Sequence, residues 1–260
     1  MIESTDQTGQ KITLNGPPQR IISLVPSQTE LLYALGLDKE TIGITRFCIH
    51  PERWYRTKTR IGGTKDLHID KIRDLHPDLV IANKEENTRE QVEEIRKFCP
   101  VWTSDVSKLT DALEMIRGIG QLTGKNDKAN RLAGVIEANL STLSSEFKPC
   151  AAAYLIWKDP YMTVGGDTFI NDMMKKCGLN NVFSHKLRYP EVTLEEIKAV
   201  SPNVVLLSSE PYPFREKHIE TLERQLPGVK VCLADGEMFS WYGSRLLHSA
   251  NYFRTLRTLF

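Results

Sequence analysis

Ile69 to Lys84 reads IDKIRDLHPDLVIANK, and Leu194 to Ser209 reads LEEIKAVSPNVVLLSS. The two stretches align without a gap, and their first residues lie 125 positions apart in the chain. Each opens with a short helical segment and then reaches a proline, Pro77 or Pro202, which ends a helix. A run of apolar residues follows each proline. The chain therefore contains an internal duplication.

The apolar runs after the two prolines are Leu79–Ile81 and Val204–Leu207. They do not alternate with polar residues, which is typical of strands buried on both faces of a parallel sheet. A further strand candidate lies upstream of each copy, at Arg20–Val25 and Ala151–Trp157, and a helix that stops at a glycine follows each of them. Strands that alternate with helices in each half predict an α/β fold with two lobes, each built on a mostly parallel sheet.

An amphipathic helix is predicted between the two copies, from Asp127 to Phe147. Its apolar residues recur at spacings of three and four: Ala129, Leu132, Ile136, Leu140, Leu143 and Phe147. At 1.5 Å per residue this helix is about 32 Å long, so we interpret it as a connector between lobes. The predicted organisation is an extension over residues 1–19, one lobe over 20–124, a connecting helix over 125–148 and a second lobe over 149–260.

The composition excludes several classes of partner. Lys and Arg number 34 and Asp and Glu 33, so the formal net charge is +1. This balance gives no electrostatic reason to expect nucleic acid as a partner. No apolar run reaches the roughly 20 residues that span a bilayer, and the first residues carry no signal-peptide core. We expect a cytoplasmic protein as the chain stands, or a periplasmic or membrane-anchored one if an export signal was removed. The five cysteines are widely spaced and are predicted to be reduced, and the protein is predicted to be a monomer.

Catalytic signatures are absent. The chain has no G-x-S-x-G, H-E-x-x-H, P-loop or G-x-G-x-x-G motif, so we do not expect an enzyme and assign no catalytic residue. The six histidines never form a close pair on one predicted face. His50 is the one metal-ligand candidate, as an axial ligand, because it lies in a loop after the strand candidate Ile42–Thr45.

Loops after the predicted strands are rich in aromatic and charged residues, which suit a large planar ligand. Loops of this kind line the ligand crevice in open α/β sheets. The candidate ligand-binding residues in or beside them are Ser27, Arg46, Phe47, His50, Thr64, Lys65, Asn83, Lys84, Trp157, Tyr161, Arg188, Tyr189, Tyr212, Asp235, Trp241 and Tyr242.

These patterns resemble the class III substrate-binding proteins of ABC importers, over roughly residues 20–255. The stretch Arg20–Glu30 resembles the family's opening strand, turn and helix, and Leu75–Ile81 resembles its most recognisable signature. Ser201–Val205 is the counterpart in the second lobe, and Gly165–Gly178 is similar to the family's second-lobe helix. The resemblance implies the helical-backbone periplasmic-binding-protein fold, with two Rossmann-like lobes bridged by one long helix.

The resemblance is strongest to the branch of the family that binds cobalamin. It implies a receptor that captures a corrinoid, ferric siderophore or haem in a cleft between lobes, with no cofactor of its own and an ABC permease as partner. The resemblance also places Thr64, Asn83–Lys84, Arg188–Tyr189 and Asp235–Trp241 at the ligand, and Glu90 and Glu216 at the transporter. The alternatives are a cytoplasmic protein that binds or senses such a chelate, and an enzyme that acts on one through His50 or Cys48.

Overall fold

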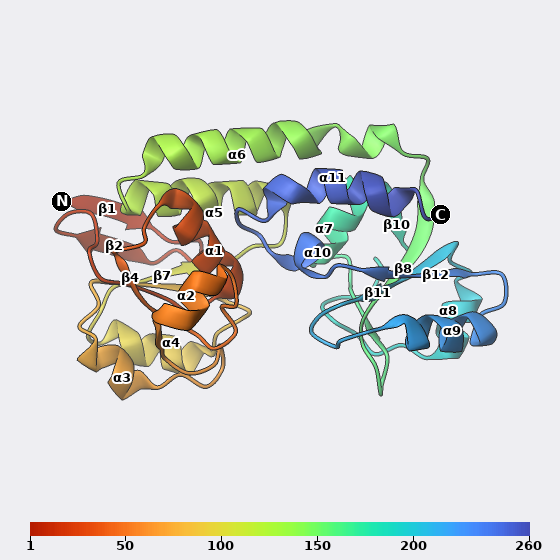
Figure 1. Ribbon diagram of the computed structural model, residues 1–260, viewed down its shortest axis with the longest axis horizontal. Coiled ribbons are helices and arrows are strands. Elements are labelled where there is room, and N and C mark those ends of the chain that lie inside the picture. The colour runs from red at the N-terminus through yellow and green to blue at the C-terminus, as the bar shows by residue number, and fades with distance from the viewer. The chain divides into compact units, whose positions relative to one another are not determined.

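The computed structural model describes residues 1–260 and divides the chain into two compact units (Figure 1). The N-terminal unit consists of Met1–Val106, Thr110–Val135 and Tyr242–Arg245, and the C-terminal unit of Ser107–Leu109, Ile136–Trp241 and Leu246–Phe260. Each unit holds a five-stranded sheet. The prediction of an α/β fold with two mostly parallel sheets is confirmed. None of the helices has the length and apolar character needed to cross a membrane.

The sheet of the N-terminal unit has the strand order β5-β4-β3-β6-β7, and all its strands are parallel. Figure 1 shows helices α3 and α4 on one side of this sheet and α5 on the other. The elements of this unit are β1 (Ile2–Thr5), β2 (Lys11–Leu14), β3 (Ile21–Ser23), α1 (Pro26–Leu35), β4 (Thr41–Ile44), α2 (Glu52–Thr57), β5 (Thr59–Arg60), α3 (Ile69–Asp74), β6 (Leu79–Asn83), α4 (Arg89–Arg96), β7 (Val101–Ser104) and most of α5 (Leu109–Leu122).

The sheet of the C-terminal unit has the order β10-β8-β11-β12, with a short strand β9 antiparallel to β8. Helices α8 and α9 lie on one side of it, and α7, α10 and α11 on the other (Figure 1). The elements of this unit are the 3₁₀ helix Leu143–Glu146, β8 (Cys150–Trp157), β9 (Met162–Thr163), α7 (Phe169–Lys176), β10 (Leu179–Asn181), α8 (Leu194–Ala199), β11 (Val204–Ser208), α9 (Glu216–Gln225), β12 (Lys230–Ala234), α10 (Glu237–Ser240) and α11 (Leu246–Arg257).

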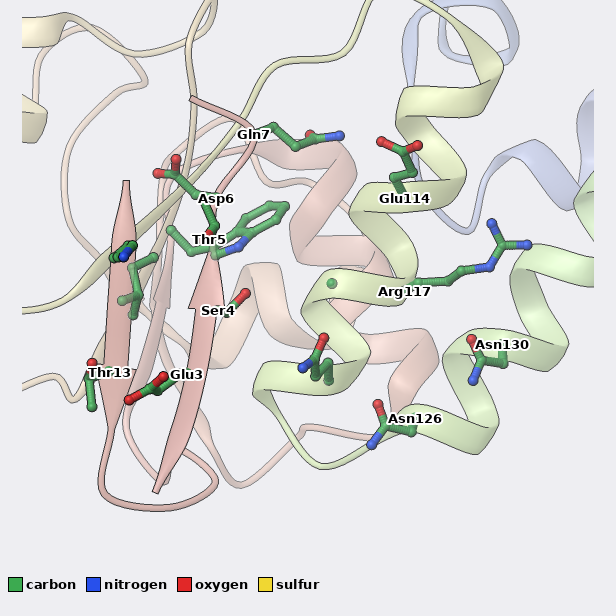
Figure 2. A pocket seen from close by; sticks show the side chains of 15 residues that line it. Glu3, Ser4, Thr5, Asp6, Gln7, Thr13, Glu114, Arg117, Asn126 and Asn130 are labelled. Atoms are coloured by element: carbon green, nitrogen blue, oxygen red, sulfur yellow. The ribbon is translucent and has the colours of Figure 1, made fainter. Parts of the chain in front are cut away.

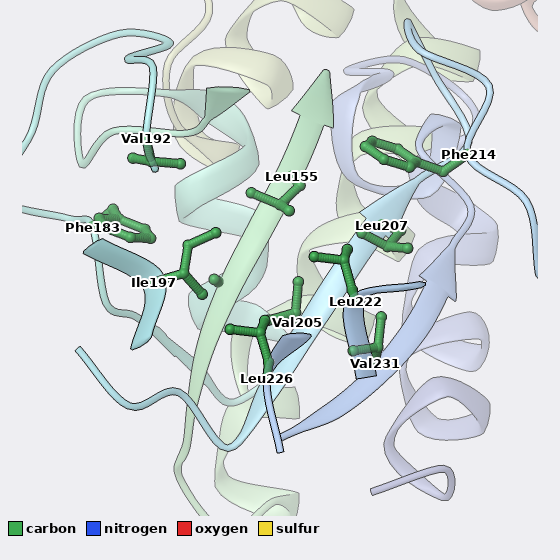
Figure 3. Close-up of a cluster of buried hydrophobic side chains, with 11 residues drawn as sticks. Leu155, Phe183, Val192, Ile197, Val205, Leu207, Phe214, Leu222, Leu226 and Val231 are labelled. Carbon is green, nitrogen blue, oxygen red and sulfur yellow. The ribbon is translucent and has the colours of Figure 1, made fainter. Parts of the chain in front are cut away.

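Both faces of the C-terminal sheet are buried, as the unalternating strands predicted. Val205 and Leu207 of β11 point to the same side as Leu155 of β8, where they pack with Ile197 of α8 and Leu222 of α9 (Figure 3). The intervening residues Val204 and Leu206 are just as inaccessible. Burying an aliphatic side chain of this size contributes about 1.5–3 kcal/mol, so the central strand stabilises both of the layers that it joins.

The duplicated segment keeps its register in three dimensions. Helix α8 begins and ends 125 positions after α3, and β11 begins and ends 125 positions after β6. The residue after each proline, Asp78 or Asn203, holds the start of the first strand of the unit's five-stranded sheet, β3 or β8. Asp78 accepts hydrogen bonds from the backbone N–H groups of Gln19 (2.7 Å) and Arg20 (2.9 Å), and Asn203 accepts one from Ala151 (3.0 Å).

Helix α6 (Asn126–Ser141) contains the point at which the two units divide, between Val135 and Ile136. Its predicted apolar face is buried at Ala129, Ile136 and Leu140. The prediction of one helix as far as Phe147 is wrong in its last turns, where a 3₁₀ helix replaces it. Serine and threonine side chains compete for backbone carbonyls there: the Ser145 hydroxyl donates to the carbonyl of Thr142 at 2.6 Å. The predicted boundaries of the two lobes stay predictions.

The sequence analysis did not predict the antiparallel hairpin formed by β1 and β2. The turn between these strands covers β7, the edge strand of the N-terminal sheet. A carboxylate oxygen of Asp6 accepts the N–H of Thr103 at 3.1 Å, and the N–H of Gln7 donates to the carbonyl of Thr103 at 3.2 Å. The Gln7 side chain then accepts the N–H of Asp105 at 3.1 Å. These bonds occupy both backbone groups of Thr103 in the edge strand and the N–H of Asp105 just after it.

Candidate functional site

Each sheet contains one point at which the strand order reverses. In the N-terminal unit the chain adds β4 and β5 on one side of β3, and β6 and β7 on the other. In the C-terminal unit the reversal lies between β8 and β11. Ligands of open α/β sheets bind beyond the carboxyl ends of the strands at such a point. The candidate surfaces are therefore the loops after β3 and β6 in one unit and after β8 and β11 in the other.

Ser27 lies beyond β3, in the first turn of α1. Its hydroxyl oxygen is buried and has no hydrogen-bond partner, and the same is true of the side-chain oxygen of the neighbouring Gln28. The amide nitrogen of Gln28 donates to the hydroxyl of Ser104 at the end of β7. Leaving a buried polar atom without a partner costs about 1–3 kcal/mol, so these oxygens mark a place where a water molecule or a ligand donor would be stabilised.

Asn83, at the end of β6, has a structural role in the loop that follows. Its side-chain oxygen accepts the N–H groups of Glu85 (2.9 Å) and Glu86 (3.0 Å), and its amide nitrogen donates to the Ser104 hydroxyl (2.9 Å). Only 2% of Asn83 is exposed. Lys84 is largely exposed and pairs with Asp105 at 2.5 Å. The loop therefore presents Lys84 to solvent and keeps Asn83 inside.

Arg46, Phe47 and the Gly63–Lys65 loop form one surface at the carboxyl ends of β4 and β5. The Arg46 guanidinium lies 5.1 Å from the centre of the Phe47 ring. A Cβ atom at residue 63 would approach both side chains to 3.1–3.2 Å, so a glycine lets them reach the loop. The Phe47 ring remains 49% exposed. This part of the N-terminal unit offers an apolar ring beside a cation.

The loop that carries Thr64 is fixed to the loop after β6, because the Asn87 side chain donates to the carbonyl of Thr64 at 2.9 Å. His50 lies further along the loop after β4 and is half-buried. No group of three or more His, Cys, Asp and Glu side chains is arranged to hold a metal ion.

Trp157, at the end of β8, belongs to a cluster of aromatic rings in the C-terminal unit. Its ring centre lies 5.7 Å from that of Tyr212, which follows β11, and Tyr212 lies 4.7 Å from Phe214. His218 packs edge-on against both Tyr212 and Phe214, and burial lowers the pKa of its imidazole. Trp157 is 40% exposed. We call Trp157, Tyr212, Phe214 and His218 the aromatic cluster.

Tyr161, Arg188 and Tyr189 lie on neighbouring backbone segments of the same unit. The carbonyl of Tyr161 accepts the N–H of Val192 at 2.9 Å, which joins the segment before β9 to the one after Tyr189. The Arg188 guanidinium lies 5.6 Å from the centre of the Tyr189 ring, and the Arg188 N–H donates to Asp167 at 2.6 Å. The structure thus brings Arg188 and Tyr189 into contact, whereas Tyr161 lies opposite Val192, further along the same pair of segments.

Asp235 and Trp241 flank α10 after the edge strand β12. The carboxylate of Asp235 accepts the N–H of Glu237 at 3.1 Å, and Trp241 is 7% exposed. The indole N–H of Trp241 donates to Glu210, a residue that the sequence analysis did not select. Tyr242 is assigned to the N-terminal unit, where Arg245 forms an ion pair with Glu30 at 2.8 Å. Nothing in the sequence signals that the Glu210 side chain is half-buried beside an indole.

Glu90 and Glu216, the predicted transporter contacts, occupy matching places in the two units. Glu90 lies in the first turn of α4, which follows β6, and Glu216 is the first residue of α9, which follows β11. Both are exposed. A carboxylate in the first turn of a helix interacts favourably with the helix dipole.

A cavity of about 970 Å³ lies elsewhere in the N-terminal unit, along α5 between the β1–β2 hairpin and the start of α6 (Figure 2). Its wall is mainly polar and includes Glu3, Glu114, Arg117 and Asn130. Trp102 also lines it, but only 2% of that residue is exposed. None of the predicted ligand-binding residues lines this cavity. Large ligands need exposed apolar and aromatic walls, which the strand-end loops provide and this cavity does not.

The sequence is similar to a known protein family and to individual proteins. The profile of a family described as "Periplasmic binding protein" matches residues 21–230. The vitamin B12-binding protein of Vibrio campbellii is 28% identical over 199 residues, which cover 75% of this chain and 72% of that protein. An uncharacterised ABC transporter substrate-binding lipoprotein of Bacillus subtilis, YvrC, is 25% identical over 213 residues, which cover 77% of this chain and 67% of that protein.

Solved structures share the fold. The periplasmic vitamin B12-binding protein BtuF of Vibrio cholerae superposes with a TM-score of 0.79 at 21% identity, over 93% of this chain and 98% of that one. The periplasmic haem-binding protein HutB of Vibrio cholerae superposes with a TM-score of 0.80 at 20% identity, over 92% of this chain and 98% of that one. At these identities the likeness establishes the architecture.

Proposed function

This chain belongs to the periplasmic binding protein family, and from this premise we propose that it captures a cobalamin-type corrinoid as the receptor of an ABC importer. The family consists of solute-binding proteins, not enzymes. Its relatives include vitamin B12-binding proteins and a substrate-binding lipoprotein. Haem and ferric hydroxamates, the ligands of further structural relatives, are the competing chelates.

The observation that carries this proposal is the aromatic cluster at the strand reversal of the C-terminal sheet. Trp157 is held edge-on by Tyr212, and 40% of it faces solvent. A rigid, partly exposed indole gives a large contact area at little entropic cost, which suits the flat face of a macrocycle. Phe47, with Arg46 beside it, provides a similar surface in the N-terminal unit. A corrinoid has both an apolar ring system and polar side groups for such surfaces.

Binding is tested by adding cyanocobalamin, cobinamide, haemin and ferrichrome separately to the purified protein, with absorbance spectra and calorimetry as readouts. We expect Trp157→Ala to weaken binding by about tenfold or more, because truncating a central aromatic anchor costs about 2 kcal/mol. Tyr33→Ala is the matched control, since Tyr33 is 43% exposed in α1 and also packs edge-on against a neighbouring ring. Equal effects of the two variants would contradict the proposal.

His50 as an axial ligand is a separate part of the proposal. The half-buried imidazole lies in the loop that also presents Phe47. Neutral imidazole is the commonest protein ligand of this kind. Aquocobalamin exchanges its axial water for imidazole, so the corrin bands of the complex should shift in the wild type and not in His50→Ala. An identical spectrum for both proteins removes His50 from the metal.

Docking of the receptor on the permease is a further part of the proposal, and it rests on the exposed acids Glu90 and Glu216. We propose that a monomer contacts the permease through both carboxylates, because like placement in the two units suits a partner with two equivalent basic surfaces. The site of action would be outside the cytoplasmic membrane. Fractionation of cells that express the full-length gene tests the location, and recovery in the cytosol would favour a binding or sensing role without a transporter.

A further inference from the structure

Glu210 follows β11 at the strand reversal of the C-terminal sheet and reaches the end of α10. One oxygen of its carboxylate accepts two hydrogen bonds, from the Ser240 hydroxyl at 2.7 Å and from the Trp241 indole N–H at 3.0 Å. The two donors are consecutive residues that end α10 and begin the segment after it. The Glu210 side chain, at the end of β11, therefore fixes the turn after α10, which follows β12.

The backbone of Glu210 is itself held in place. The Ser208 hydroxyl donates to the Glu210 carbonyl at 2.6 Å, and the Tyr154 hydroxyl of β8 donates to Ser208 at 3.2 Å. Gly236, at the start of α10, allows the Glu210 side chain to pack closely against the backbone of α10. A Cβ atom at residue 236 would lie 2.5 Å from the Cγ of Glu210 and 2.6 Å from the Ser208 hydroxyl. Packing on both sides thus leaves the carboxylate little freedom.

The electrostatic surroundings of Glu210 are acidic. Burial raises the pKa of its carboxyl group, and the charges of Glu237 and Asp235 act in the same direction. The hydrogen bonds from Ser240 and Trp241 lower that pKa in part. Two further titratable groups lie near the turn: Tyr154 of β8 and Tyr252 of α11. The Tyr252 hydroxyl oxygen accepts the N–H of Asp235. Glu210 has no ion pair with a cation.

We propose that Glu210 is a positioning residue of the ligand site: its carboxylate fixes Ser240 and Trp241, so that ligand affinity depends on this acceptor although Glu210 does not touch the ligand. This inference rests on the proposed function, because it assigns the turn at Trp241 to the binding surface. The indole N–H is already donated to Glu210 and Trp241 is 7% exposed, so the indole supports the turn from within and donates no hydrogen bond to a ligand. Protonation of the carboxylate weakens both bonds, since hydrogen bonds to a charged acceptor are the stronger ones.

A consequence for pH follows from this arrangement. As the pH falls through the raised pKa of Glu210, the turn loses its charged acceptor, and ligand affinity falls with it. A glutamine at residue 210 keeps a neutral oxygen in the same position and does not titrate. A leucine of similar size keeps the packing against Gly236 and removes the acceptor. The two substitutions therefore separate the hydrogen bonds from the shape of the side chain.

The test uses the full chain as wild type, Glu210→Gln and Glu210→Leu, with Glu223→Gln as the control. Glu223 is an exposed acid of α9 in the same unit. The four tryptophans give four indole N–H signals in a ¹H–¹⁵N spectrum, and Trp241→Phe identifies the relevant one. These signals are followed against pH without ligand, and affinity for cyanocobalamin, haemin and ferrichrome is then measured at neutral and mildly acidic pH.

We expect the Trp241 signal to move with pH in the wild type and in the control, and to stay fixed in Glu210→Gln. We also expect Glu210→Gln to bind at neutral pH about as weakly as the wild type binds at acidic pH, and to show no further loss of affinity on acidification. Glu210→Leu should bind about tenfold more weakly, as the loss of a charge-assisted hydrogen bond implies. A Trp241 signal that titrates alike in wild type and Glu210→Gln overturns the inference, and so does full affinity in a folded Glu210→Leu.

Failure of this inference is distinguishable from failure of the proposed function. If the wild type binds none of the three probes, the proposed ligand class is wrong. The titration of the Trp241 signal needs no ligand and still decides whether Glu210 holds the turn. If Glu210→Leu loses its fold by circular dichroism, the glutamine variant alone decides, because it conserves both the shape and an acceptor oxygen.

Discussion

His76 and Ser201 adopt the same left-handed backbone conformation, with φ of 44° and 45°, and each directly precedes the proline of its copy of the repeat. This conformation is unusual for residues with a side chain and allows the chain to pass from α3 to β6 and from α8 to β11 within four residues. The duplication therefore extends to backbone torsion angles.

Valine at either of these positions should destabilise its unit. A β-branched residue in the left-handed region costs about 1–2 kcal/mol, whereas asparagine tolerates it. We expect His76→Val and Ser201→Val to lower the midpoint of urea unfolding, and His76→Asn and Ser201→Asn to leave it nearly unchanged. Equal midpoints for the valine and asparagine variants would show that the angle is not maintained in solution.

Two helical glycines should respond in opposite ways to alanine. A Cβ atom at Gly120 of α5 would lie 2.2 Å from the Cβ of Ala129 in α6, whereas one at Gly134 would meet nothing within 4 Å. Gly134→Ala should stabilise the protein by about 1 kcal/mol through helix propensity. Gly120→Ala should destabilise it by about 1–3 kcal/mol, because α5 and α6 must move apart. Thermal unfolding of both variants checks the sign of each change.

Substitution of Glu210 should also change how stability varies with pH. Because the folded-state pKa is raised above its ordinary value of 4.5, the native state binds more protons than the unfolded chain between these two values. Wild-type stability therefore falls as the pH rises through that window. Glu210→Gln lacks this loss, so its melting temperature should exceed that of the wild type at neutral pH, and the difference should shrink below pH 4.5. A constant difference across the range would contradict the raised pKa.

Arg245 and Glu30 make a bidentate pair, with bonds of 2.8 Å and 3.1 Å, and 14% and 20% of their side chains are exposed. Arg245→Lys should cost about 1–2 kcal/mol of stability, since an ammonium cannot make both bonds. Arg254 is the matched control: it pairs with Glu146 at 2.7 Å and 2.8 Å, but about 45% of its side chain is exposed. Its replacement by lysine should change stability little, because solvent screens the pair. Chemical unfolding compares the two variants.

The sequence carries the information for the fold mainly in the strands that are buried on both faces. Leu79–Asn83 and Val204–Ser208 have the boundaries that an apolar run after a proline predicts within one or two residues. Thr168 caps α7, where its hydroxyl oxygen accepts the N–H of Asn171 at 3.2 Å. The β1–β2 hairpin was missed because its apolar residues, Ile12 and Leu14, are few and are separated by polar ones.

The candidate site was less predictable than the fold. The conformation of a loop depends on its tertiary contacts, which a periodic sequence pattern does not show. Trp157 and Tyr212 were selected as aromatic residues at strand ends, and the structure brings them into contact. Asn83 was selected on the same grounds, yet its side chain bonds to its own loop. Glu210 has the opposite character: as an acidic residue before a proline it is expected to be solvent-exposed, and only the fold makes it half-buried beside Trp241. The predicted set remains a proposal as a ligand site.

The turn at Asp6 and Gln7 also has a meaning for self-association. An uncovered edge strand offers unpaired N–H and C=O groups to any other chain, which is a common route to fibrous aggregates. In this protein Thr103 has both backbone groups bound by that turn. Asp6 is further held by Arg96 at 3.3 Å. The turn at Asp6 and Gln7 thus leaves Thr103 no free backbone group with which to pair a strand of another molecule.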